Sequence, residues 1–244
     1  MSLLRPTRLA FSLSVTVLLA ACQSTQHKIP TIQTDNGKRI YIPQEQVQYV
    51  PQLQPKAMPE QFRTWLNERH HASDTRSYEQ YLIRQQGTNY VPMFELLRSA
   101  RDWQRCGRSP YALPSRELWN NIVPTLKIIN ELVEQKILSD FEVTSVYRDL
   151  PLNQCAGGAS SSRHLFNSAI DFRVGSATPN HQEQMYIDMT KAKICSYWRQ
   201  HGQRQNMGVG VYSSGQIHID TQGFRTWGPD LSRYSSPCYD FSEL

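Results

Sequence analysis

The sequence predicts an α+β domain in which an antiparallel sheet has helices packed on one side. The first observation is a set of short segments in which apolar and polar residues alternate, a pattern typical of strands. These strands are predicted at 141–146, 169–174, 208–212 and 216–221. The second observation is a spacing of three or four between apolar residues, which predicts helices at 115–133 and 181–200. The elements follow one another without a regular βαβ alternation, so we expect antiparallel pairing.

The N-terminus is typical of an export signal. Arg5 and Arg8 give it a positive charge, and an apolar run from Leu9 to Ala20 follows. This run is too short to span a membrane and instead predicts a signal peptide over residues 1–21.

The signal peptide ends in Leu-Ala-Ala-Cys at residues 19–22, which resembles the lipobox of bacterial lipoproteins. We therefore expect Cys22 to be lipidated and to become the first residue of the mature chain. Gln23, rather than an aspartate, follows it, which favours the outer membrane. The predicted location is the periplasmic side of a bacterial membrane, with a lipid anchor at Cys22.

Two segments precede the main domain. Residues 22–56 are rich in Gln, Pro and Thr and are typical of a tether, apart from Arg39–Ile42, a short run that could pair as an edge strand before Pro43. Residues 57–104 carry apolar residues at helical spacing and predict a helical N-terminal segment. The remaining residues, 105–244, form the main domain.

The helix predicted after Ser115 contains one irregularity. Ser115 is a good N-cap, and apolar residues follow at spacings of three or four up to Val133. Pro124 interrupts this pattern, so we expect a kink or two abutting helices there. Further along, Ser213-Ser214-Gly215 separates the last two predicted strands and is typical of a hairpin turn.

The charge and the cysteine content indicate which partners and which cellular compartment to expect. The formal net charge of +5 is not concentrated in a Lys/Arg block, so we expect no nucleic-acid partner. Four cysteines remain after Cys22, an even number that predicts two disulfides in an exported chain. Four cysteines allow three connectivities, and the sequence alone does not choose among them. We favour Cys106–Cys155 and Cys195–Cys238, because these pairs would tie the start of the domain to the loop before His164 and the C-terminal tail to a helix.

Two histidines and an aspartate form the most informative group of residues. His164 precedes Asp171 by seven residues, and His218 lies in the last predicted strand. A loop before the 169–174 strand can turn His164 and Asp171 toward one point. Two imidazoles and a carboxylate are a usual ligand set for catalytic zinc, which keeps a fourth position for water. The group therefore predicts a metal-dependent hydrolase.

Polar residues near these ligands predict substrate contacts. Arg148 follows a predicted strand, where it could bind a substrate carboxylate or the oxyanion of a tetrahedral intermediate. Ser162 lies two residues before His164, and Gln216 shares a strand face with His218. We expect all three to contact substrate. Ser162, His164 and Asp171 are too close in sequence for a serine-hydrolase triad, and no G-x-S-x-G turn is present.

An ordered series of motifs resembles the zinc D-Ala-D-Ala carboxypeptidases, which share a fold with lysostaphin-type enzymes and hedgehog domains. The series covers roughly residues 105–230 and comprises Ser145-Val146-Tyr147-Arg148, Asn153, Gly157-Gly158-Ala159, Ser162-x-His164, Ala169-x-Asp171, Gly208-Val209-Gly210-Val211-Tyr212 and His218-Ile219-Asp220. The resemblance implies a periplasmic peptidase that cleaves peptidoglycan stem peptides, as a carboxypeptidase or as an endopeptidase. It implies Zn²⁺ ligation by His164, Asp171 and His218, and substrate or transition-state contact by Arg148.

The chain departs from this family at two places. A glycine often follows the first histidine by three residues, and here that residue is Asn167, which predicts a change in loop geometry. Several relatives have an acidic base three residues before the second histidine, or a histidine two before it; these positions are Gly215 and Gln216. We therefore expect Asp220 to act as the general base, or to orient a ligand histidine.

The uncertain base leaves other functions open. A zinc-containing domain that binds stem peptides without cleaving them is the main alternative, because hedgehog domains show that this fold serves recognition. A lipoprotein scaffold built on residues 57–104 is another, and it predicts a partner protein and no dependence on zinc.

Overall fold

The computed structural model describes residues 34–35, 38–39 and 55–239. The predicted signal peptide, the predicted lipidation site Cys22 and the greater part of the predicted tether lie outside the described residues. The chain divides into two units, Met1–Val47 and Gln48–Leu244. In the first unit, β1 (Thr34–Asp35) pairs antiparallel with β2 (Lys38–Arg39). Arg39 of the run expected as an edge strand takes part, and the rest of that run lies outside the described residues.

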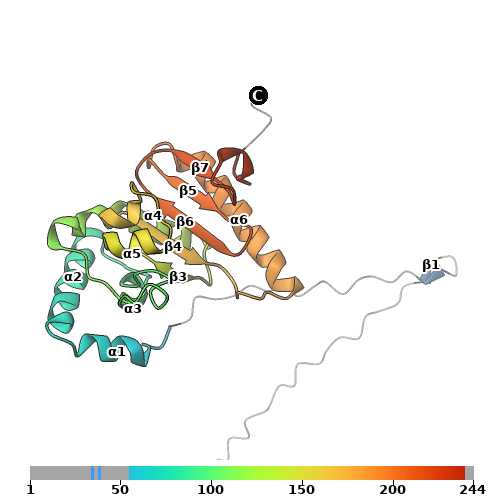
Figure 1. The fold of residues 1–244 in the computed structure, drawn as a ribbon. Helices are drawn as coiled ribbons and strands as arrows, with labels where there is room; N and C mark the ends of the chain where they lie inside the picture. The colour runs from blue at the N-terminus through green and yellow to red at the C-terminus, as the bar shows by residue number, and fades with distance from the viewer. Residues whose placement is uncertain (1–33, 36–37, 40–54, 240–244) are drawn as a thin grey trace, which may run out of the picture. The chain divides into compact units, whose positions relative to one another are not determined.

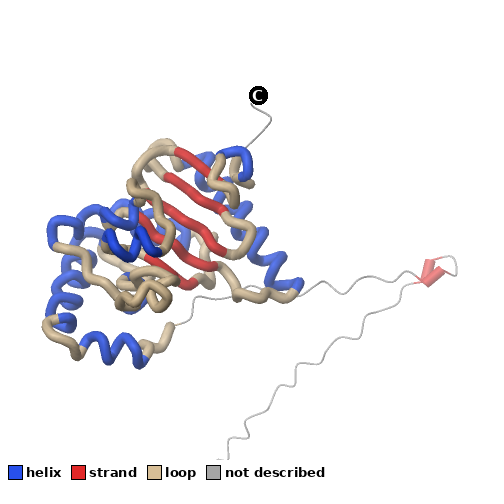
Figure 2. Tube along the Cα trace, in the orientation of Figure 1, coloured by secondary structure: helices blue, strands red, loops and turns tan. Residues whose placement is uncertain are grey.

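The second unit contains a five-stranded sheet in the order β3-β4-β6-β5-β7 (Figures 1 and 2). The strands are β3 (Glu142–Ser145), β4 (Ala169–Arg173), β5 (Gly208–Val211), β6 (Gln216–Asp220) and β7 (Arg225–Trp227). The first four pair antiparallel, as expected, whereas β7 is parallel to β5, so the sheet is mixed. The predicted α+β class is confirmed.

Helices precede the sheet and connect its strands. They are α1 (Glu60–Leu66), α2 (His71–Gln86), α3 (Met93–Leu96), η1 (Arg116–Ile122), α4 (Val123–Glu134), α5 (Leu150–Cys155), η2 (Arg163–Phe166), α6 (His181–His201) and η3 (Arg233–Ser235). Helix α6 runs behind the sheet in the view of Figure 1. Among the described residues no helix combines the length and the apolar character needed to cross a membrane.

The irregularity predicted at Pro124 divides the helix into two abutting parts. The 3₁₀ helix η1 ends at Ile122, and α4 begins at Val123 with Pro124 in its first turn. Proline is well tolerated there, because the first turn of a helix leaves its N–H groups unpaired. Thr125 follows and donates a hydrogen bond to the Ser168 carbonyl at 2.9 Å, which ties α4 to the start of β4.

Alternation along β4 and β6 separates the core from the polar face of the sheet. Ile217 and Ile219 belong to the buried core, together with Ile170 and Phe172 of β4. Side chains two apart in a strand share a face, so His218, between the two isoleucines, lies on the opposite face from them. The core helices therefore support one side of the sheet, and the polar residues of the site occupy the other.

Both disulfides favoured from the sequence are present. Cys106–Cys155 joins the segment after α3 to the end of α5, and Cys195–Cys238 joins α6 to the segment after η3. The first closes a sequence separation of 49 residues. A cross-link of this span stabilises a chain by about 3–4 kcal/mol in the chain-entropy estimate.

Candidate metal centre and active site

The three candidate ligands converge on one face of the sheet. His164 lies in η2, while Asp171 of β4 and His218 of β6 are direct partners in the strand register. His164 Nε2 is 3.1 Å from Asp171 Oδ2, and His218 Nδ1 is 2.7 Å from Asp171 Oδ1. One ligand atom from each residue lies within 4.8 Å of the others. A single ion could therefore contact all three residues.

Hydrogen bonds fix the orientation of both imidazoles. His164 Nδ1 donates to the Val146 carbonyl at 2.5 Å, so Nε2 faces Asp171 with its lone pair. His218 directs Nδ1 toward Asp171, and its Nε2 is 3.0 Å from Asp220 Oδ2. Ligand histidines in metal sites usually have such a partner on the other ring nitrogen. The arrangement leaves one nitrogen of each ring for a metal.

The charges of the three groups are strongly coupled. Burial lowers the pKa of His164, which favours the neutral form that a metal requires. Burial alone would raise the pKa of Asp171, but His164 and His218 hold it well below its usual range. Burial alone would lower the pKa of His218, but Asp171 and Asp220 raise it to about 9. Without a metal, therefore, His218 is protonated at neutral pH and lies between the two carboxylates of Asp171 and Asp220.

The donor set fits zinc. It consists of two nitrogens and a carboxylate on rigid elements, and the side chains of His164, Asp171 and His218 are only 4%, 16% and 10% exposed. A metal bound there would take the place of the His218 proton, because a ligand imidazole must be deprotonated on the coordinating nitrogen. Zinc, if bound, would be held by these three side chains.

Asp220 lies behind His218, and both of its carboxylate oxygens are hydrogen-bonded. Its side chain is 0% exposed, and Arg225 donates to both of its oxygens, at 3.0 Å and 2.6 Å. The backbone N–H of Gln222 donates a hydrogen bond to Oδ1 at 2.9 Å, and His218 Nε2 is hydrogen-bonded to Oδ2. Burial alone would raise the pKa of Asp220, but these partners lower it to about 2. Of the two roles expected for Asp220, this geometry favours the orientation of His218 over proton abstraction.

The glycine at position 208 makes the contact between Arg225 and Asp220 possible. In the sheet, Gly208 lies between Arg225 of β7 and Asp220 of β6. A Cβ at Gly208 would lie 2.6 Å from Arg225 Nη1 and 2.9 Å from Asp220 Oδ1. The absence of a side chain therefore allows Arg225 to cross β5 and reach the carboxylate.

Gly210, two residues further along β5, likewise allows a side chain of β7 to lie across the strand. It lies between His218 and Trp227, and a Cβ there would be 2.5 Å from the Trp227 ring. The indole consequently lies across β5, with its centroid 5.1 Å from that of His218. Trp227 therefore forms a wall of the site beside His218.

Tyr212 follows β5 and brings a hydroxyl to the site. Trp227 Nε1 donates to the Tyr212 hydroxyl oxygen at 3.1 Å, which leaves the hydroxyl proton available for another acceptor. Burial raises the pKa of Tyr212, and the charge of Asp171 adds to the increase, while Arg101 and Arg148 oppose it. The hydroxyl is therefore neutral at pH 7 and lies within the electrostatic reach of the metal centre.

Arg148 lies inside the site, as expected. Its Nη2 donates to Asp171 Oδ2 at 2.6 Å, and its Nε donates to Ser145 Oγ at 2.8 Å. The backbone N–H of Arg148 donates to the His164 carbonyl at 3.2 Å. Ser162 is half-buried at the start of η2, and the described residues provide no hydrogen-bond partner for its hydroxyl. Both remain predicted substrate contacts.

Neither Gly215 nor Gln216, the two positions where relatives have a base, can provide one in this chain. A Cβ at Gly215 would lie 2.0 Å from the Val174 carbonyl oxygen, so the backbone there leaves no room for any side chain. Gln216 is only 5% exposed, and its amide lies 3.2 Å from Thr144 Oγ1. With its oxygen turned the other way, it accepts two hydrogen bonds from Arg173 at 3.1 Å. Gln216 therefore borders the site from a buried position.

Asn167 preserves the backbone geometry that a glycine would favour. Its φ and ψ are 51° and 44°, in the left-handed region that glycine and asparagine tolerate best. Its Nδ2 donates to the Tyr78 hydroxyl and to the Leu118 carbonyl, both at 3.0 Å. The sequence predicted a change of loop geometry here, but the left-handed conformation is one that either residue can adopt.

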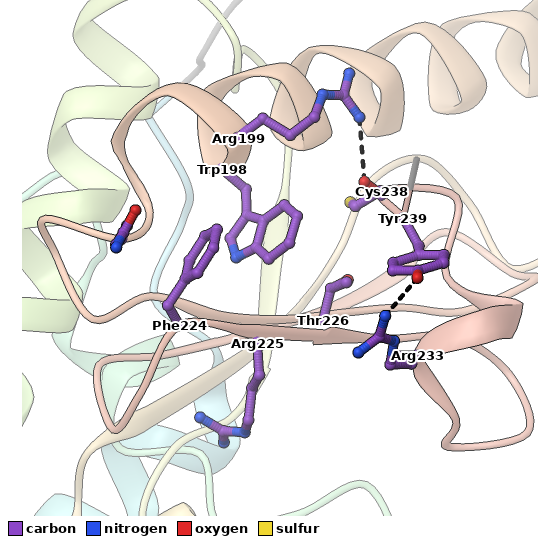
Figure 3. Close-up of a pocket in the computed structure, with 9 residues that line it drawn as sticks. Trp198, Arg199, Phe224, Arg225, Thr226, Arg233, Cys238 and Tyr239 are labelled. Atoms are coloured by element: carbon purple, nitrogen blue, oxygen red, sulfur yellow. Dashed lines mark hydrogen bonds between the residues drawn. The ribbon is translucent and has the colours of Figure 1, made fainter. Parts of the chain in front are cut away.

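A pocket of about 520 Å³ lies on the other side of β7 (Figure 3). Trp198 and Phe224 stack in it with centroids 4.4 Å apart. Arg225 also borders it, but Figure 3 shows the Arg225 guanidinium directed away from those rings. That direction leads to Asp220, so this pocket and the metal centre use opposite faces of the strand.

Comparison with known proteins supports this assignment of the site. A family model described as Peptidase M15 matches residues 95–220, which include Arg148 and all three candidate ligands. No curated protein and no solved structure matches the chain.

Proposed function

We propose that this chain, which belongs to the Peptidase M15 family, is a zinc metallopeptidase that hydrolyses peptidoglycan stem peptides. Membership of the family makes it a metallopeptidase. The observation that carries the zinc assignment is the convergence of His164, Asp171 and His218 with the remaining nitrogen of each histidine already bonded. When bound, zinc polarises a carbonyl and lowers the pKa of a water toward neutrality, so that the water can attack.

The chain's own residues supply the other requirements of peptide hydrolysis. The Arg148 guanidinium has further N–H groups beyond those bonded to Asp171 and Ser145, and these can bind a substrate carboxylate or an oxyanion. The Tyr212 hydroxyl can donate to the same oxygen. Arg225 and Asp220 hold His218, and Trp227 excludes water from one side. A D-Ala-D-Ala carboxypeptidase and a murein endopeptidase both fit this arrangement.

Product analysis tests the proposed reaction. Purified chain is incubated with defined muropeptides, and the products are identified by mass spectrometry, with a His164→Ala variant and a chelator-treated sample alongside. We expect loss of a terminal D-Ala or cleavage of a cross-link by the wild type, and no product in either of the other samples. Identical products from the wild type and the variant would contradict the proposal.

The Tyr212→Phe variant tests the hydroxyl donor. We expect kcat to fall by about 100-fold, because one donor to the developing oxyanion is lost, with little change in KM. Zinc content should be unchanged, since Tyr212 is not among the three candidate ligands. Steady-state kinetics with a single muropeptide measures the effect. A kcat equal to that of the wild type would exclude Tyr212 from this role.

One observation favours a second function, a domain that binds stem peptides without cleaving them. The described part of the chain has no side chain at Gly215, and it buries Asp220 and Gln216, so the groups considered as bases are occupied or absent. In that case the muropeptides would bind the zinc-loaded chain, and no product would form over long incubation.

We also propose that the chain is anchored by a lipid at Cys22 on the periplasmic side of the outer membrane. The lipobox-like sequence and Gln23 support this location. The mass of the N-terminal peptide of chain purified from membranes tests it, since an unmodified Cys22 would rule out the anchor.

A further inference from the structure

We propose that a hollow beside β3 binds an acidic part of the peptide substrate and that Arg101 recognises its carboxylate. This inference rests on the proposed peptidase function and adds a determinant of substrate choice. The hollow has a volume of about 380 Å³, and its lining includes Arg98, Arg101, Trp103, Tyr111, Glu142 and Thr144.

The hollow adjoins the metal centre through Thr144. The hydroxyl of this residue is 3.3 Å from the Asp171 carbonyl oxygen and 3.2 Å from the side-chain amide of Gln216. Arg101, which lines the same hollow, is close enough to the site for its charge to oppose the rise in the pKa of Tyr212. A peptide with its scissile bond at the three ligands could therefore extend into the hollow.

The charges in the hollow favour an anion. Arg98 is paired with Glu142, so these two residues are neutral together. Arg101 is exposed and forms no ion pair or hydrogen bond through its side chain with any residue between 55 and 239. Guanidinium groups bind carboxylates through two parallel hydrogen bonds. An uncompensated arginine at the edge of a peptide-binding site is suited to an acidic side chain of the substrate.

The segment that carries Arg101 is held firmly in place. Val146 N donates to the Arg98 carbonyl at 2.8 Å, and Ser145 Oγ donates to the Ser99 carbonyl at 2.6 Å. Ser99 N donates to the Pro110 carbonyl at 3.0 Å, which closes the segment on itself. The disulfide between Cys106 and Cys155 then joins it to α5. Preorganisation of this kind lowers the entropic cost of binding.

The helical N-terminal segment supports the same wall. Tyr111 packs against Phe62 and Trp65 of α1, with ring centroids 4.9 Å and 5.7 Å apart. Trp103 is half-buried and provides an apolar surface next to Arg101. Residues 57–104 consequently contribute to substrate binding through the position of this wall, in addition to their packing.

The test compares two substrates and two variants. The substrates are a synthetic stem peptide that ends in D-Ala-D-Ala and carries one free side-chain carboxylate, and the same peptide with that carboxylate converted to an amide. The variants are Arg101→Gln and, as a control in the same segment, Arg105→Gln, since Arg105 is paired with Asp102 and does not line the hollow.

We expect Arg101→Gln to lower kcat/KM for the acidic peptide by about 10- to 100-fold, the loss expected for one charge-assisted contact. The amidated peptide should react equally with the wild type and with Arg101→Gln, and Arg105→Gln should behave as the wild type with both. An equal loss with both peptides, or no loss with either, would overturn the inference.

Binding measurements separate this inference from the proposed hydrolysis. Calorimetric titration of the His164→Ala chain with the acidic peptide needs no turnover. Tighter binding of the acidic peptide than of the amide, lost in His164→Ala/Arg101→Gln, supports the inference even if the wild type releases no product. Equal binding of the two peptides overturns it, as does inorganic phosphate that displaces the acidic peptide at comparable concentration.

Discussion

Asp171→Ala is expected to remove metal binding and to lower hydrolysis by at least about 1,000-fold, because several kcal/mol of transition-state stabilisation by the metal are lost. Asp171 is the centre of the site, since Arg148, His164 and His218 all contact its carboxylate. In the metal-free chain, the change removes the anion that faces Arg148 and the protonated His218. We expect the free energy of unfolding to fall by about 3–5 kcal/mol, as when one partner of a buried ion pair is deleted.

The two effects are measured separately. Zinc content and product formation are measured on the chain as purified, and chemical denaturation is measured on chelator-treated wild type and variant. Glu183→Ala serves as the matched control, because it removes a carboxylate that is bonded to Ser176 and is not among the three candidate ligands. Metal binding by Asp171→Ala at wild-type affinity would show that the candidate ligand set is wrong.

The pH dependence of the metal-free chain provides a further check on the same centre. The pKa of His218 is about 9 in the folded chain and about 6.5 when unfolded, so this histidine stabilises the fold fully below pH 6.5. That contribution disappears as the pH rises through about 9. The pKa of Asp171 is lowered, so its contribution is present above about pH 4 and is lost in acid. Asp171→Ala should therefore cost most stability between these limits.

The ligands could be predicted from the sequence because their chemistry fixes their residue types. The chain has seven histidines, and the ordered motif series singled out His164 and His218 with Asp171, while the alternation around His218 predicted a rigid strand for it. The orientation of the rings could not be predicted in the same way. It depends on the Val146 carbonyl and on Arg225, and neither contact follows from a local pattern.

Helix α5 and strand β7 were not predicted from the sequence, for different physical reasons. Helix α5 had a local signal, because Asp149 caps it by accepting from Leu152 N and Pro151 lies in its first turn. Strand β7 has three residues and no alternation to detect, and its parallel pairing with β5 depends on the whole sheet. Only tertiary structure reveals it.

The roles of the glycines in the sheet also became clear only from the structure. From sequence, the Gly-Val-Gly-Val segment at 208–211 predicts only a strand. In the sheet, Gly208 and Gly210 are the places where Arg225 and Trp227 cross a neighbouring strand. The close approach of Gly215 to Val174 likewise explains why no acid can occupy that position. Asp220 is therefore the residue to test as a general base.

Asp220→Asn distinguishes the two roles considered for this residue. If Asp220 orients His218, the change weakens the hydrogen bond to the ligand histidine, and zinc affinity should fall by about 10- to 100-fold. Hydrolysis should then recover toward the wild-type kcat when zinc is supplied in excess. A general base, in contrast, would be lost at every zinc concentration, and kcat would stay low.

Arg225→Gln is the matched control for this experiment, because Arg225 donates to both oxygens of Asp220; its guanidinium also lies 5.1 Å from the centroid of the Trp227 ring. If Asp220 orients His218, Arg225→Gln should weaken zinc binding in the same direction and should also recover with added zinc. Zinc titrations of chelator-treated protein, combined with kcat at saturating zinc, measure both variants. The buried carboxylate, with its lowered pKa and every oxygen bonded, leads us to expect recovery in both. If Asp220→Asn stayed inactive when saturated with zinc while Arg225→Gln recovered, Asp220 would be the general base.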